Sequence, residues 1–128
     1  MGRAMLPTVP SHDYKDLLAW QKAMDLAEAV YTATSYMPRE ERFELVRQAR
    51  RAAVSIPANI AEGQGRKTSA QFFQFLAIAH GSLRELETHL MLAERLRLLP
   101  KMETDKVLAS AAEVGRLING LSRSLHVR

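Results

Sequence analysis

The stretch FFQFLAIAHGSLRELETHLMLA, residues 72–93, carries the clearest structural signal in the chain. Its apolar residues recur in alternating steps of four and three positions. They are Phe72, Leu76, Ala79, Leu83, Leu86, Leu90 and Ala93. Because an α-helix completes one turn in about 3.6 residues, these side chains form a stripe along one helix face. The pattern predicts a long helix that packs in a helical bundle.

The residues just before this stretch predict a capped helix start and a sharp turn. The tetrapeptide TSAQ, which begins at Thr68, fits a capping box, in which the threonine hydroxyl accepts a hydrogen bond from a backbone N–H three residues later. Gly63 and Gly65 predict a C-cap and a tight reversal after the preceding helix. Pro57 cannot donate a backbone hydrogen bond, so it predicts a kink inside that helix.

Three further helices show bundle spacing. The first is expected over residues 16–36 with Asp16 as its cap. Its inward stripe is Ala23, Leu26, Ala27, Val30, Tyr31 and Thr34. The second begins near Arg39, with Glu40 and Glu41 in its first turn. Its apolar positions are Phe43, Val46, Ala49, Ala53, Ile56 and Ile60. The last helix follows Pro100. Its stripe is Val107, Leu108, Ala111, Val114, Ile118, Leu121 and Leu125.

No segment alternates with the period of a β-strand, so the 128 residues predict one all-α domain. The short connections between helices place successive helices antiparallel. We therefore expect an antiparallel up-down four-helix bundle over residues 14–125, preceded by a flexible N-terminal leader over residues 1–13.

The composition excludes several classes of protein. Cysteine is absent, which excludes disulfides, thiolate metal sites and cysteine nucleophiles. No apolar run approaches the roughly 18 residues that span a bilayer. The N-terminal segment MGRAMLPTVPSHD lacks the continuous apolar core of a signal peptide. We expect a cytoplasmic protein that makes no contact with membranes.

Candidate catalytic and metal-binding residues do not combine into a recognisable site. Glu85 and His89 are four residues apart and can share a helix face, but di-metal sites in bundles need Glu-x-x-His pairs from two helices. Ser55 and Ser82 lie in predicted helices without a positioned base. The sequence therefore predicts no enzyme, no metal and no cofactor.

Basic residues cluster around the double-glycine turn. The net charge is +4, and the charged residues between Leu45 and Ala61 are all arginines. This balance favours a polyanionic partner. The start of the helix at Thr68 also offers backbone N–H groups to a phosphate, although the turn does not match a Walker A loop. The candidate contacts to RNA or DNA are Arg47, Arg50, Arg51, Arg66 and Lys67.

A structural role for the same arginines is the competing interpretation. An antiparallel pairing about the turn brings Ala52 and Ala53 opposite Ala79 and Gly81. It also brings Arg50 and Arg51 near Ser82 and Glu85, and Arg47 near Glu85. Arginine–glutamate pairs across this interface would then hold the two helices together.

Three blocks resemble a known family in order and spacing. They are LLAWQKAMDLAEAVY (17–31), QARRAAVSIPANIAEGQGR (48–66) and FLAIAHGSLRELETHL (75–90). The family is a bacterial four-helix-bundle family that includes proteins encoded within intervening sequences of large-subunit (23S) ribosomal RNA genes. The resemblance covers residues 14–122.

The resemblance implies a ring-like homopentamer with no established biochemical role. The accessory variability determinant protein of diversity-generating retroelements is similar in fold, and it forms a basic pentamer that binds nucleic acid and a reverse transcriptase. The matching positions include Pro57, Gly63 and Gly65 at the kink and turn. The resemblance also implies a polar seam between the facing helices, formed by Ser55, Asn59, Glu62, Ser82, Glu85 and Glu87.

Two hypotheses about function follow. The first is a non-enzymatic oligomer that binds RNA or DNA through a basic surface repeated around the ring. The alternative is a protein-interaction scaffold, which binds another protein, uses its arginines structurally and has no affinity for nucleic acid. Charge and the resemblance favour the first.

Overall fold

The computed structural model describes residues 13–38 and 42–125. A 3₁₀ turn, η1 (Tyr14–Asp16), precedes helix α1 (Leu18–Thr34). A π-helical turn, η2 (Arg42–Val46), leads into α3 (Arg47–Gln64), which is followed by α4 (Ser69–Arg95) and α5 (Lys101–Ser124). Apart from Asp13, the predicted leader lies outside the described residues, as does the predicted helix start at residues 39–41.

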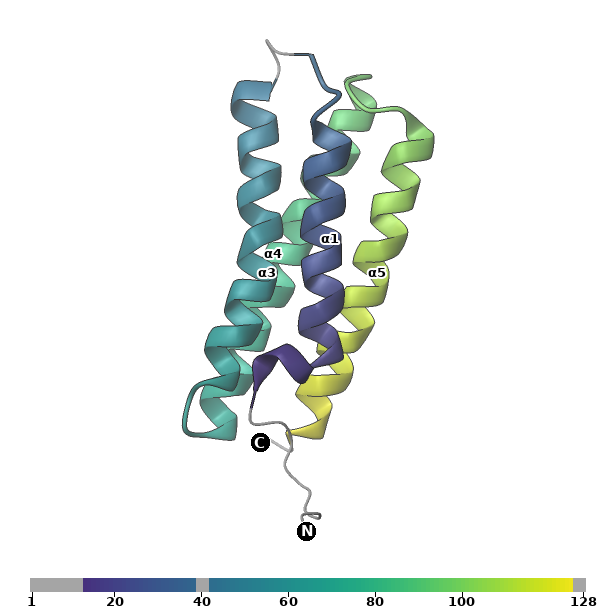
Figure 1. Cartoon of the computed structure of the whole chain (residues 1–128). Coiled ribbons are helices and arrows are strands. Elements are labelled where there is room, and N and C mark those ends of the chain that lie inside the picture. The colour runs from purple at the N-terminus through teal and green to yellow at the C-terminus, as the bar shows by residue number, and fades with distance from the viewer. Residues whose placement is uncertain (1–12, 39–41, 126–128) are drawn as a thin grey trace.

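Figure 1 shows the four long helices side by side, each running in the opposite direction to the one before it. Helix α3 packs on α1 and on α4, and α5 packs on the same two helices. The connections at residues 65–68 and 96–100 are too short to cross the length of the bundle. Consecutive helices must therefore be antiparallel neighbours. The predicted all-α four-helix bundle is confirmed.

The core is built from the predicted apolar stripes. In α4, all stripe positions from Leu76 to Ala93 are buried, and Phe72 packs against them partly buried. Burying a leucine side chain stabilises the folded state by about 1.5–3 kcal/mol, so these stripes supply much of the driving force for folding. The prediction for Tyr31 is wrong, because its ring lies at the edge of the α1 stripe and is 45% exposed.

Gly63 is required at the α3–α4 turn for close packing. A Cβ atom added there would lie 2.6 Å from Cβ of Phe75 and 2.9 Å from Cδ1 of Phe72. Gly65 is the C-cap of α3 and has a φ of −79°, a right-handed conformation that any residue adopts. The predicted C-cap at Gly65 is therefore confirmed, but its backbone does not need the conformational freedom of glycine. Pro57 lies inside α3, which continues to Gln64; its kink stays a prediction.

Helix ends agree only in part with the predicted caps. Oγ1 of Thr68 accepts a hydrogen bond from the backbone N–H of Gln71 at 3.1 Å, which confirms the start of α4. The predicted cap at Asp16 is wrong, because Asp16 lies within η1. Instead, the Asp13 side chain caps that turn, accepting from the N–H of Lys15 at 3.0 Å, and α1 begins afterwards without a side-chain cap.

The end of α4 contains a strained residue. Arg97 has a φ of 61°, and among the described residues other than glycine it alone has a positive φ. Its N–H donates to the carbonyl of Glu94, and the N–H of Leu98 donates to the carbonyl of Ala93, both at 2.9 Å. This pattern is a Schellman motif, which usually carries glycine at the left-handed position.

Candidate nucleic-acid interface

Arg50 extends from α3 toward α1. Its Nε donates to Oγ1 of Thr34 at 3.0 Å, and its Nη2 donates to the carbonyl of Tyr31 at 3.3 Å. Its guanidinium carbon also lies 4.4 Å from the centre of the Tyr31 ring, within range of a cation–π interaction. Arg50 therefore links α3 to α1. These contacts occupy its guanidinium group and leave little of it to bind an external phosphate.

The expected approach of Arg50 to Ser82 and Glu85 is wrong for a geometric reason. Residues five apart are separated by about 140° around a helix axis. Since Ser55 faces α4, Arg50 must face the other neighbour, α1. Glu85 instead contacts His89 of its own helix, with 3.5 Å between Oε2 and Nε2.

Arg47 and Arg51 lie exposed on α3. Within the described part of the chain, Arg51 has no ion pair or hydrogen bond from its side chain. Its guanidinium group therefore remains able to contact an external anion. Such a contact with a phosphate can be bidentate, which suits arginine better than lysine.

Arg66 and Lys67 occupy the α3–α4 turn but differ in their surroundings. Nη2 of Arg66 donates to Oε2 of Glu62 at 3.0 Å, and its guanidinium carbon lies 4.7 Å from the centre of the Phe75 ring. Lys67 is exposed and has no ion pair among the described residues. Both line a hollow of about 350 Å³ together with Thr68 at the start of α4.

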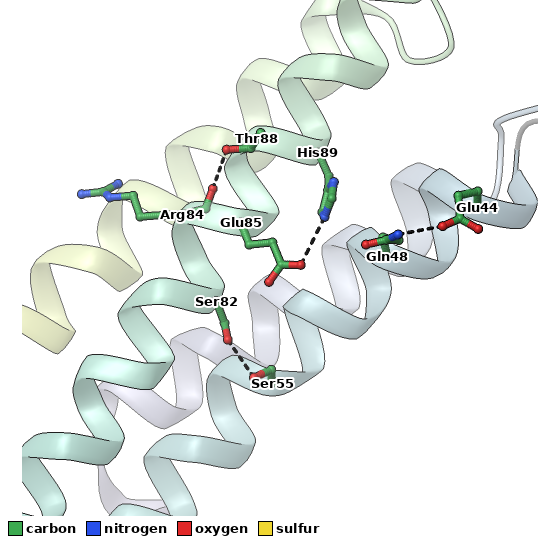
Figure 2. Close-up of polar contacts among 8 residues, drawn as sticks. All are labelled: Glu44, Gln48, Ser55, Ser82, Arg84, Glu85, Thr88 and His89. Carbon is green, nitrogen blue, oxygen red and sulfur yellow. Dashed lines mark hydrogen bonds and ion pairs between the residues drawn. The ribbon is translucent and has the colours of Figure 1, made fainter.

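The polar seam is centred on two serines. Figure 2 shows Ser55 of α3 and Ser82 of α4 facing each other, with their hydroxyl oxygens 2.8 Å apart. Asn59 joins them, because its Nδ2 donates to the carbonyl of Ser55 at 2.8 Å and to the hydroxyl at 3.0 Å. These half-buried hydroxyls fix the register of α3 against α4, because a slip would leave them unpaired.

The remaining seam candidates are not brought together with these serines. Glu62 pairs with Arg66 at the turn, and Glu87 accepts from Nη1 of Arg84 at 2.7 Å. Figure 2 shows Glu85 with His89, and these two residues lie above the serines in the view. Gly81 was expected to meet α3, but a Cβ atom added there would meet nothing within 4 Å, so Gly81 faces away from the bundle.

Two further regions escaped prediction. From Ser69 to Leu83, α4 contains no lysine, arginine, aspartate or glutamate. From Val114 to Ser124, α5 contains Arg116 and Arg123 but no acidic residue. The sequence shows that both segments lack acidic residues. It does not show that they are neighbours, because only the packing of α4 on α5 brings them into one surface.

The described residues show neither a metal cluster nor a membrane span. No group of three or more histidine, aspartate or glutamate side chains among them could hold a metal ion. In the same part of the chain, no helix is both long enough and apolar enough to cross a bilayer.

Comparison with known proteins identifies the family. No curated protein matches the chain. A crystal structure of a Bacteroides thetaiotaomicron protein of unknown function, described as from the S23 ribosomal protein family, superposes with a TM-score of 0.77. The two sequences are 22% identical, and the match covers 82% of this chain and 98% of the other, which shows a shared fold. The family model described as 23S rRNA-intervening sequence protein matches residues 15–120, so the chain belongs to that family.

Proposed function

We propose that this protein is a non-enzymatic homo-oligomer that binds RNA or DNA through basic side chains repeated around a ring, which we expect to be a pentamer. The observation that carries the proposal is the pair Arg51 and Lys67, two exposed cations without an ion-pair partner among the described residues. Cations that no carboxylate neutralises are the ones that displace counterions from a phosphate backbone.

The net charge and the surroundings of these cations support the same conclusion. The chain carries a formal charge of +4, and no acidic residue occurs between Gly63 and Arg84. Lys67 therefore stands at the start of a stretch without acidic residues, and its charge attracts a polyanion over the length of about 8–10 Å set by physiological salt. The family description also names a ribosomal RNA gene region, which is consistent with an RNA context.

Assembly into a ring is supported by apolar side chains that one bundle leaves exposed. On α4 and its C-cap residue these are Ile78, Met91, Leu92 and Leu96, each more than two-fifths exposed. Their spacing places Ile78, Leu92 and Leu96 on the outer face of the helix, where a second subunit can cover them. A ring presents each phosphate-binding side chain several times, so interactions that are weak singly bind strongly together.

The alternative, a scaffold that binds another protein, is favoured by Arg50. That residue is used entirely in holding α3 to α1. If Arg47 and Arg51 serve subunit contacts in the same way, only Arg66 and Lys67 at the turn remain of the candidate contacts to nucleic acid. Replacement of Arg51 would then prevent assembly of the oligomer, and the protein would bind neither RNA nor DNA.

Fluorescence anisotropy across a salt series distinguishes nucleic-acid binding from the protein scaffold. Labelled single-stranded RNA and DNA of the same sequence are titrated with the wild type and with Arg51→Gln/Lys67→Gln. A matched control, Lys15→Gln/Lys106→Gln, removes two exposed lysines elsewhere on the bundle. The proposal predicts affinity that falls as salt rises. It also predicts that the slope of log K against log salt shrinks by about 0.7 for each phosphate that the variant no longer neutralises.

The oligomeric state of each variant is measured by sedimentation velocity. Weaker binding by an intact Arg51→Gln/Lys67→Gln oligomer, with the control unchanged, supports phosphate binding by these two cations. An equal decrease in the control would mean that only total charge matters. If the wild type binds neither RNA nor DNA at low salt, the nucleic-acid function is rejected and the protein-interaction scaffold becomes the preferred function.

A further inference from the structure

A second hollow, of about 250 Å³, lies between α4 and α5 on the surface that lacks acidic residues. Its polar lining residues are His80 of α4 and Asn119 and Ser122 of α5. Phe73 contributes an aromatic ring that is 39% exposed, and the buried side chains of Leu76 and Ile118 complete the apolar part of the lining. The hollow therefore combines a flat apolar group with three hydrogen-bonding side chains.

His80, which lines the hollow, carries an unsatisfied polar atom that solvent does not reach. Its Nε2 is buried and has no hydrogen-bond partner. A buried nitrogen without a partner costs free energy, and such atoms in proteins usually have a water molecule or a ligand as partner. Among the described residues it is the one buried side-chain nitrogen or oxygen in this condition.

Positive charge flanks the hollow. Arg116 and Arg123 are exposed on α5, on either side of Asn119 in the sequence, and neither forms an ion pair with a described residue. A ligand in the hollow is therefore favoured if it carries negative charge beside its neutral part.

The chemistry selects one class of ligand. A purely apolar group would not use the polar side chains of Asn119 and Ser122, and an inorganic anion would not use the Phe73 ring. The volume lies just below the range of about 300–1,000 Å³ typical for drug-sized ligands, so it suits a single planar ring system. An unstacked nucleobase offers a face that stacks on an aromatic ring, edges that exchange hydrogen bonds, and flanking phosphates.

We propose that this hollow, the base pocket, holds one unstacked base of a single-stranded nucleic acid, with Phe73 stacking on its face and Asn119 and Ser122 contacting its edge. The inference rests on the proposed function and limits the nucleic-acid partner to unpaired strands. A duplex keeps its bases paired and stacked, so only a single strand, or a loop or end, can deliver a base to the pocket.

The test compares two labelled DNA single strands of equal length by fluorescence anisotropy. One carries pyrimidine bases, and the other carries abasic tetrahydrofuran residues with the same number of phosphates. The wild type is expected to bind the base-bearing strand about tenfold more tightly, as expected for stacking one base on an aromatic ring. Phe73→Ala and, independently, Asn119→Ala should remove most of this preference, leaving affinity for the abasic strand and its salt dependence unchanged.

Gln74→Ala serves as the matched control, because Gln74 is exposed on α4 next to Phe73 and does not line the pocket. Far-UV circular dichroism and sedimentation velocity establish that each variant keeps its helices and its oligomeric state. Equal affinity of the wild type for the two strands would overturn the base pocket while leaving phosphate binding intact. A preference that survives in both pocket variants would overturn it as well. Failure to bind either strand at low salt would reject the proposed function itself.

Discussion

Replacement of Gly63 by alanine is expected to destabilise the bundle, although alanine is the better helix former. The Cβ atom it introduces would lie 2.6 Å from Cβ of Phe75 and 2.9 Å from Cδ1 of Phe72. The Phe72 ring can rotate away, but Cβ of Phe75 is attached directly to the backbone of α4. Restoring an ordinary carbon–carbon contact of about 3.5 Å therefore requires α3 and α4 to separate by almost 1 Å at the turn.

The magnitude follows from two opposing terms. Alanine gains up to about 1 kcal/mol over glycine inside a helix, and less near the helix end, where Gly63 lies. Overpacking of a close contact costs about 1–3 kcal/mol, and the upper half of that range applies where a backbone must move. The net expectation is a decrease of about 1–3 kcal/mol in the free energy of unfolding.

The assay is urea unfolding followed by far-UV circular dichroism, repeated at several protein concentrations so that any effect on assembly is separated from the effect on the fold. Gly120→Ala is the matched control. It also lies near the end of its helix, but the nearest atom to its added Cβ is the flexible Nη2 of Arg123 at 4.0 Å. The control is expected to be neutral or stabilised. If Gly63→Ala is as stable as Gly120→Ala, the close approach at the turn does not limit the packing of α3 on α4.

Three further predictions concern single side chains. Arg97→Gly should stabilise the protein by about 1 kcal/mol, because it removes the strain of a left-handed non-glycine residue; a thermal midpoint unchanged or lowered would contradict this. Arg50→Ala should cost about 1–2 kcal/mol in urea unfolding, because it removes two hydrogen bonds and the cation–π interaction with Tyr31, and Arg50→Lys should recover only part of that. Full recovery by lysine would mean that charge alone matters. Ser55→Ala and Ser82→Ala should show a coupling energy of about 0.5–1.5 kcal/mol in a double-mutant cycle, and strictly additive effects would exclude a hydrogen bond between them in solution.

The helices and their buried faces could be predicted because both are local properties. The spacing of apolar residues over residues 72–93 repeats with the period of a helix, so the buried face of α4 follows from that pattern alone. Thr68 likewise acts on a backbone group only three residues away. Tyr31 was misplaced because it lies at the edge of its stripe, where a residue's exposure depends on which neighbour covers it.

The candidate site was predicted less completely, for a reason that Arg50 illustrates. The sequence places Arg50 about 140° from Ser55 around α3, but it does not say which of its neighbours stands on each side. That order belongs to the assembled bundle, where α3 lies between α1 and α4. Long side chains can reach either neighbour, so their partners cannot be assigned before the order is known.

By itself, the sequence determined the number of helices, their buried faces and a basic turn with a capped start, because each depends on residues close together in the chain. Only the tertiary structure decided which cations are free, that Gly63 serves a close contact, and that His80 and Asn119 line one hollow. These properties join residues far apart in the sequence, and packing alone fixes the distances between them.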